Sequence, residues 1–230
     1  MIEKIKNEVK LLMAGDNTGH GFEHVERVYN TAFNLCKEGG VDREIVALAS
    51  LLHDVDDYKL FGQKCADNLT NAKIIMDKCG ISCDKQLKVC DVIANMGYSK
   101  ALKGIRPTSS EGKIVSDADM LDAIGANGIV RCMAFALARC ETPIFDSEIW
   151  PETEMSAEEY KKPNRKSDNF INHFFEKLLK LKNMMLTNAG KEEALKRHKL
   201  MVDFLEGYFR ENNLQKWLQY LYDYELKVSK

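Results

Sequence analysis

Apolar residues recur at intervals of three and four along almost the whole chain, and this helical period constrains the fold more than any other feature. No alternating β pattern runs beyond four residues, and there is no internal repeat or low-complexity tract. The pattern predicts an all-α fold of about eight helices. The expected helices run from Phe22 to a stop at Gly39-Gly40, from Asp42 into His53-Asp54, and over 67–78, 84–95, 113–139, 169–186, 191–211 and 214–228. Gly80 and Gly97 are expected to end the helices over 67–78 and 84–95 as left-handed C-caps. The helix over 113–139 is expected to bend near Gly125 or Gly128.

The length of 230 residues suits one full-sized domain covering 1–230. Pro143, Pro151 and Pro163 interrupt the segment 141–168, which lacks sustained periodicity and is expected to be a long surface loop. Such a loop could be a lid or an interface. The helices of 169–230 are expected to pack on a core formed by about 18–140.

The charge balance gives no reason to expect polyanionic partners, because 33 basic residues face 35 acidic ones for a net charge of −2. No run approaches the roughly 18 apolar residues of a membrane span, and the first residues mix charged with apolar side chains, unlike a signal peptide. We therefore expect a cytoplasmic protein that binds neither nucleic acid nor membranes; its oligomeric state is open. Seven cysteines without an export signal predict reduced thiols, mostly buried, and the spacing of Cys79, Cys83 and Cys90 matches no common zinc site.

Histidines and aspartates gather on three of the expected helices. Imidazole and carboxylate together suit a divalent metal such as manganese, iron, nickel or zinc, whereas purely carboxylate sites favour magnesium or calcium. The residues concerned are His24 on the first helix, His53 and Asp54 at the end of the second, and Asp117, Asp119 and Asp122 in the segment SDADMLDAIG.

The adjacent pair His53-Asp54 follows a stripe of aliphatic residues and so places a charge beside the core. Neighbouring residues of a helix point about 100° apart and ordinarily cannot serve one apolar face. A buried carboxylate is costly unless it is paired or coordinates a cation. Asp54 is thus expected to meet either a metal ion or a basic partner such as an arginine.

Four segments, in this order, resemble the HD-domain superfamily of metal-dependent phosphohydrolases, and within it the branch of YedJ-like and YpgQ-like proteins. They are HGFEHVERVYNTA, ALASLLHDVDDYK, EGKIVSDADMLDAIGANGIVR and NHFFEKLLKLKNMMLT, and the resemblance covers roughly residues 18–212. It implies an all-helical bundle that holds one divalent ion at its centre.

The resemblance implies His24, His53, Asp54 and Asp119 as the metal ligands, with manganese expected and magnesium, nickel, iron or zinc as alternatives. Asp117 is the alternative to Asp119 and would otherwise accept a hydrogen bond from a ligand histidine. Met120 departs from the family pattern, which has a basic residue there.

The resemblance also suggests a catalytic role for two residues. Asp57 lies one helical turn after His53 and is a candidate acid or base, and His20 precedes His24 by one turn. Candidates for binding the substrate phosphate or closing the pocket are Arg27, Lys59, Arg131, His173 and Lys177. Each of these seven residues could instead have an ordinary structural or solvated role. His198 and the pair Phe174-Phe175 are expected to be structural.

The function implied is hydrolysis of a nucleotide or a similar small phosphate ester, and first of all cleavage of a nucleoside triphosphate to monophosphate and pyrophosphate. A nucleoside 5′-monophosphate phosphatase and a cyclic-nucleotide phosphodiesterase are alternatives within the same class. A regulatory module that binds a nucleotide without turnover is an alternative of another class.

Overall fold

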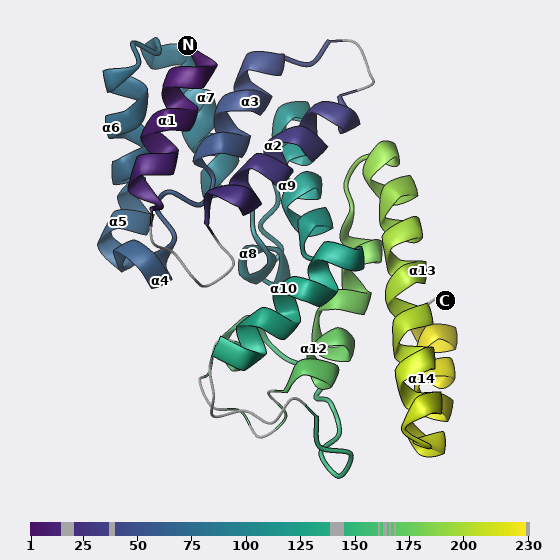
Figure 1. Cartoon of the computed structure of the whole chain (residues 1–230). Coiled ribbons are helices and arrows are strands. Elements are labelled where there is room, and N and C mark those ends of the chain that lie inside the picture. The colour runs from purple at the N-terminus through teal and green to yellow at the C-terminus, as the bar shows by residue number, and fades with distance from the viewer. Residues whose placement is uncertain are drawn as a thin grey trace. The chain divides into compact units, whose positions relative to one another are not determined.

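The computed structural model describes residues 1–14, 21–36, 40–138, 145–160, 162, 165, 167 and 169–228. Within these residues every regular element is a helix (Figure 1), which confirms the all-α class. The chain divides into two compact units, residues 1–122 and 123–230. The expectations of a single domain over 1–230 and of C-terminal helices packed on an 18–140 core stay predictions.

Unit 1 is built around helix α3 (Arg43–Leu52), whose residues from Ile45 to Leu52 are all buried. A helix that is apolar on every side must be surrounded by others; α1, α2, α7 and α9 pack against it (Figure 1). Each aliphatic side chain fully buried there contributes about 1.5–3 kcal/mol. The helices of unit 1 are α1 (Ile2–Leu12), α2 (Phe22–Leu35), α3, α4 (Tyr58–Phe61), α5 (Gln63–Asn68), α6 (Thr70–Lys78), α7 (Cys83–Ala94), α8 (Tyr98–Leu102) and α9 (Ser110–Asp122).

The expected helix starts at Phe22 and Asp42 are confirmed. Helix α2 begins at Phe22, and the Asp42 carboxylate caps α3 by accepting from the backbone N–H groups of Glu44 at 3.0 Å and Ile45 at 3.3 Å. The helix expected over 84–95 is present as α7, but Gly97 does not cap it in the left-handed conformation. Its angles of φ 106° and ψ 149° are open mainly to glycine and place it at the start of α8 instead.

The helix expected over 113–139 is two helices, α9 and α10 (Gly125–Ala138). The interruption falls at Gly125, as the sequence suggested, since its φ of 77° lies in the left-handed region.

Unit 2 departs from the expected helix bounds in two places. The helix expected over 169–186 stops at Glu176, because Lys177 adopts φ −138° and ψ −60°, and a 3₁₀ segment follows. Helix α13 begins at Asn188 rather than Lys191, because the Thr187 hydroxyl accepts from the Gly190 N–H at 2.9 Å and caps the earlier start. The helices of unit 2 are α10, α11 (Ala157–Tyr160), α12 (Phe170–Glu176), η1 (Leu178–Met184), α13 (Asn188–Glu211) and α14 (Gln215–Val228).

The described part of the expected 141–168 loop is tied to the helices of unit 2. The buried Asn172 amide donates to the carbonyl oxygens of Ile149 and Ser167, both at 3.0 Å. The Trp217 indole donates to the Ser147 carbonyl at 3.0 Å, and the Trp150 ring stacks on Trp217 at 4.3 Å. The segment is therefore held against α12 and α14 by specific polar contacts.

Taken one at a time, the described helices are too short or too polar to cross a membrane; only α9 and α10 together reach the necessary length and composition. The cysteines in the described residues form no disulfide; Cys36 is buried and Cys83 is exposed, so the expected burial holds only in part.

Candidate metal centre

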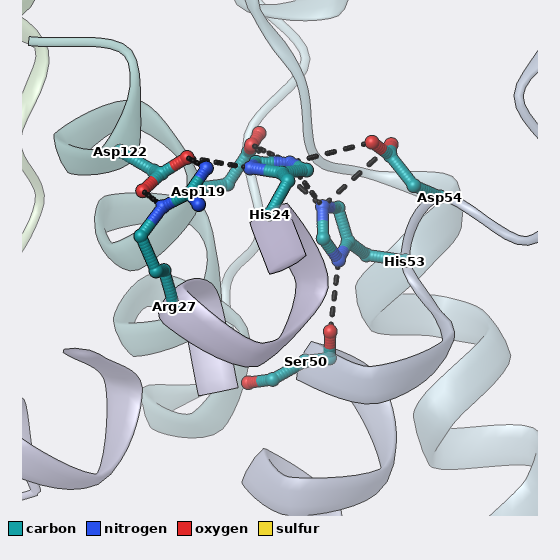
Figure 2. A network of polar contacts seen from close by, with 7 residues as sticks. All are labelled: His24, Arg27, Ser50, His53, Asp54, Asp119 and Asp122. Carbon is teal, nitrogen blue, oxygen red and sulfur yellow. Dashed lines mark hydrogen bonds and ion pairs between the residues drawn. The ribbon is translucent and has the colours of Figure 1, made fainter. Parts of the chain in front are cut away.

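Two histidines from different helices face each other inside unit 1. His24 lies in the first turn of α2, and His53 directly follows α3. Their Nε2 atoms are 3.2 Å apart, and the side chains are only 1% and 2% exposed (Figure 2). The buried helix α3 thus delivers one imidazole to the start of α2.

Both imidazoles are oriented through their other nitrogen. The Nδ1 atom of His24 is 2.7 Å from Asp122 Oδ2, and that of His53 is 2.8 Å from the Ser50 carbonyl oxygen. A carbonyl oxygen can only accept, and so can an ionised carboxylate, so we place the hydrogen of each neutral ring on Nδ1. The two Nε2 lone pairs then point at each other, an arrangement that favours a cation between them.

Two carboxylates complete the group (Figure 2). Asp54 oxygens lie 3.3 Å from His24 Nε2 and 3.6 Å from His53 Nε2, and Asp119 Oδ1 lies 3.6 and 3.7 Å from the same nitrogens. Ligand atoms of His24, His53 and Asp119 all fall within 4.8 Å of one another. Asp54 and Asp119 are 17% and 26% exposed, so the buried imidazoles form the floor of the site and the carboxylates its solvent side.

Asp117 and Asp119 lie on different sides of α9. Residues two apart on α9 point about 200° from each other, so only one can face the imidazoles, and the structure brings Asp119 there. Asp117 is fully buried, and its charge acts on Arg106. Burial lowers the pKa of Arg106, and the Asp117 carboxylate opposes that shift.

Asp122 is a site residue whose role the sequence did not identify. It lies one turn after Asp119, and the two carboxylates meet opposite ends of the His24 ring. Arg27 donates to both oxygens of Asp122, from Nε at 2.8 Å and from Nη2 at 3.1 Å. This hydrogen bond raises the pKa of Arg27 above its usual value, although burial acts in the opposite direction. The three-residue spacing from Asp119 is the signal that could have identified Asp122.

The turn that carries His53 and Asp54 is fixed by Asp56, which lies two residues after Asp54. The Asp56 carboxylate is buried and accepts from the N–H groups of Asn71 at 2.8 Å and Ala72 at 2.9 Å, and from the Cys65 thiol at 2.9 Å. These N–H groups belong to the first turn of α6, which has no side-chain cap of its own. Asp56 therefore caps α6 from fifteen residues upstream.

The other candidates in unit 1 are less defined. The half-buried Asp57 lies beyond the ligand pair, and its backbone N–H donates to the Asp54 carbonyl at 3.1 Å. Lys59 is in α4, but its side chain is outside the described structure, and His20 falls outside the described residues. Neither is placed relative to the imidazoles.

The remaining phosphate-binding candidates are in unit 2. His173 and Lys177 both lie near Tyr160, with a ring separation of 6.4 Å for His173 and an Nζ-to-ring distance of 5.9 Å for Lys177. Arg131 is partly exposed on α10. The structure thus brings His173 and Lys177 around one aromatic ring, which the sequence reasoning did not anticipate.

The residues expected to be structural lie in the interior of unit 2. Phe174 and Phe175 are fully buried, and His198 Nε2 contacts Glu225 Oε2 at 2.7 Å. Lys182 Nζ lies 3.1 Å from the same oxygen. Burial raises the pKa of Glu225, but the hydrogen bonds and charges of His198 and Lys182 outweigh it and lower the pKa overall.

Comparison with known proteins identifies the family of the chain. The HD domain family model matches residues 21–124, which include all four candidate ligands and Asp122. The chain belongs to the HD domain family, in its YpgQ-like branch.

Its relatives extend over most of the chain. It is 33% identical over 208 residues to the uncharacterised protein YpgQ of Bacillus subtilis, covering 88% of this chain and 89% of YpgQ. The crystal structure of an HD-superfamily hydrolase from Bacillus thuringiensis is similar with a TM-score of 0.70 at 34% identity, covering 92% and 96% of the two chains. The crystal structure of B. subtilis YpgQ in complex with ADP is similar with a TM-score of 0.67 at 27% identity, covering 92% and 97%.

Proposed function

We propose that this protein is a metal-dependent phosphohydrolase that acts on a nucleotide or a similar small phosphate ester. The observation that carries the proposal is the pair of buried Nε2 atoms 3.2 Å apart, flanked by the carboxylates of Asp54 and Asp119. With the ring hydrogens assigned to Nδ1, all four groups are acceptors, and they repel one another unless a cation binds. His24, His53, Asp54 and Asp119 would hold that ion.

The donor set fits a divalent ion by its chemistry. Two neutral imidazoles and two carboxylates balance the charge of one such ion, and mixed nitrogen and oxygen donors favour manganese, iron, nickel or zinc over magnesium. Among these ions we propose manganese first, as the family resemblance implies. When bound, the ion supplies a Lewis acid that activates water and withdraws charge from a phosphate group.

The chain itself would bind and orient the substrate on the solvent side of the site, where Asp54 and Asp119 are partly exposed. We propose Asp57 as the group that takes or gives a proton at its carboxylate, because it lies in the same turn as Asp54. His20 would assist it. Lys59, Arg131, His173 and Lys177 are proposed to neutralise phosphate oxygens or close the pocket.

The nucleotide part of the proposal is supported by the relative YpgQ, whose crystal structure contains ADP. Within this class we propose cleavage of a nucleoside triphosphate to monophosphate and pyrophosphate. The released products separate this reaction from removal of a single phosphate and from opening of a cyclic nucleotide.

The test is a panel of nucleoside tri-, di- and monophosphates and cyclic nucleotides, incubated with manganese, magnesium, nickel or zinc, with products separated by chromatography. His53→Ala and Asp54→Ala should lose bound metal and turnover together. Asp67→Asn is the matched control, because Asp67 is an exposed aspartate of unit 1 that contacts Gln63. Metal-loaded wild-type protein that binds nucleotide but releases no product would refute the enzyme and favour a regulatory module.

A further inference from the structure

We propose that Arg27 and Asp122 act as a positioning pair that sets the metal affinity of the site through His24, and that Arg27 is not a phosphate-binding residue. The inference rests on the proposed metal centre and deepens it. Its starting point is the chain of contacts from Arg27 through Asp122 to His24 Nδ1, on the side of the ring away from the ligand group (Figure 2).

The pair arises from matching spacings on two packed helices. His24 and Arg27 are three residues apart on α2, and Asp119 and Asp122 are three residues apart on α9. Side chains at this spacing share a helix face, and α2 packs against α9. One turn therefore supplies the two candidate ligands, and the next supplies the pair that supports them.

The contacts at Asp122 use both of its oxygens. Its side chain is 2% exposed; Oδ2 is 2.7 Å from His24 Nδ1 and 3.1 Å from Arg27 Nη2, and Oδ1 accepts from Arg27 Nε at 2.8 Å. A buried carboxylate without a cationic partner would be costly. Arg27 supplies the compensating charge, so the pair is neutral and leaves the charge of the ligand set unchanged.

Because the pair is neutral and contacts His24 at Nδ1, its main effect on the ion passes through the imidazole. The carboxylate holds the ring in the form with hydrogen on Nδ1, which leaves Nε2 directed at the metal position. Partners of this kind typically change metal affinity by about 10- to 100-fold when they are removed. The guanidinium fork in turn fixes the carboxylate by two parallel hydrogen bonds, so it is occupied and not directed at a phosphate.

The experiment measures the affinity of metal-free protein for manganese and for zinc, by competition with a chelating dye. Asp122→Asn should weaken binding by about 10- to 100-fold. An asparagine should keep its oxygen toward Arg27 and present its NH₂ group to Nδ1, because the opposite orientation would set NH₂ against the guanidinium donors. The ring hydrogen then moves to Nε2. Arg27→Met should also weaken binding, and the double variant should be no weaker than Asp122→Asn, because Arg27 acts through Asp122. Arg210→Met, at an exposed arginine paired with Glu206 on α13, is the matched control and should bind metal as the wild type does.

A second measurement is independent of metal and of turnover. Nitrogen-15 NMR of the histidine rings in metal-free protein should show His24 with its hydrogen on Nδ1 in the wild type and a shift toward Nε2 in Asp122→Asn. Arg27→Met with wild-type metal affinity, a changed KM and an unchanged His24 ring would overturn the inference and return Arg27 to the substrate. A wild-type protein that binds neither ion would overturn both proposals, whereas one that binds metal but hydrolyses no nucleotide would refute only the activity.

Discussion

Replacement of Asp56 by alanine should destabilise unit 1 and loosen the proposed metal centre at the same time. The Asp56 carboxylate, 4% exposed, accepts from two backbone N–H groups of α6 and one thiol, two residues after Asp54. Helix α6 begins after Leu69, which has a φ of 50° and offers no side-chain cap. No other described side chain accepts from the N–H groups of Asn71 and Ala72.

The magnitude follows from those contacts. Loss of an N-cap alone typically costs about 1 kcal/mol, and a hydrogen bond to a charged group contributes about 1.5–3 kcal/mol. Ala72 is fully buried, so its N–H would be left without water as a replacement acceptor. We expect Asp56→Ala to lower the free energy of unfolding by about 3–4 kcal/mol. At about 2–4 °C per kcal/mol for a chain of this size, the melting midpoint should fall by about 10 °C.

The assay is thermal and urea unfolding of the metal-free full chain, followed by a metal titration of each variant. Asp56→Asn keeps one acceptor oxygen and should lose roughly half as much stability. Asp67→Ala is the control at an exposed aspartate and should stay within about 0.5 kcal/mol of the wild type. If Asp56→Ala had the same melting midpoint as this control and bound metal normally, the cap that Asp56 provides to α6 would have no energetic role. That result would refute the reasoning.

Asp119→Asn should lose metal affinity by at least about tenfold while Asp117→Asn keeps it, as a metal titration would show; the opposite order would reverse the ligand assignment. Burial acts to raise the pKa of Glu225, but its partners lower the pKa overall in the folded protein. The ionised carboxylate should therefore stabilise the fold above about pH 4.3, the pKa in the unfolded chain, and this contribution should be lost as the pH falls through the folded pKa. In urea unfolding, the free energy of unfolding of Glu225→Gln should fall less steeply between neutral and acidic pH than that of the wild type, and an equally steep fall would contradict this. Glu176→Ala leaves the buried guanidinium of Arg165 without its 2.8 Å partner and should cost about 3–5 kcal/mol in urea unfolding, whereas a loss below about 1 kcal/mol would show that the pair is dispensable.

The parts of the fold that the sequence predicted are those set by local pattern. Apolar periodicity and the Asp42 cap were enough to identify α2 and α3, because a helix face and an N-cap involve residues only a few positions apart. The same holds for the break near Gly125, where one glycine adopts a left-handed conformation. The helix over 169–186 was predicted wrongly as continuous, because the break at Lys177 has no local sequence signal.

The proposed site was predictable where chemistry alone selects residues, and unpredictable where selection depends on packing. Residue type alone identifies histidines and aspartates near apolar helices as possible ligands, and the resemblance to the HD-domain superfamily selected the four candidates among them. Which aspartate supports His24 depends on how α9 packs against α2, and the answer was Asp122 rather than Asp117. The role of Asp56 depends on a contact with α6 fifteen residues away, which no periodicity encodes.

The burial of α3 explains how the chain itself holds the candidate ligands in position. Residues 45–52 are enclosed on every side, so the end of the helix has little freedom to move, and His53 directly follows it. The Ser50 carbonyl fixes the His53 ring at 2.8 Å, and Asp56 fixes the turn beyond Asp54. Sites built on rigid elements hold their groups more accurately than sites on loops. The same apolar residues that stabilise unit 1 therefore also supply the preorganisation that a tight metal centre requires.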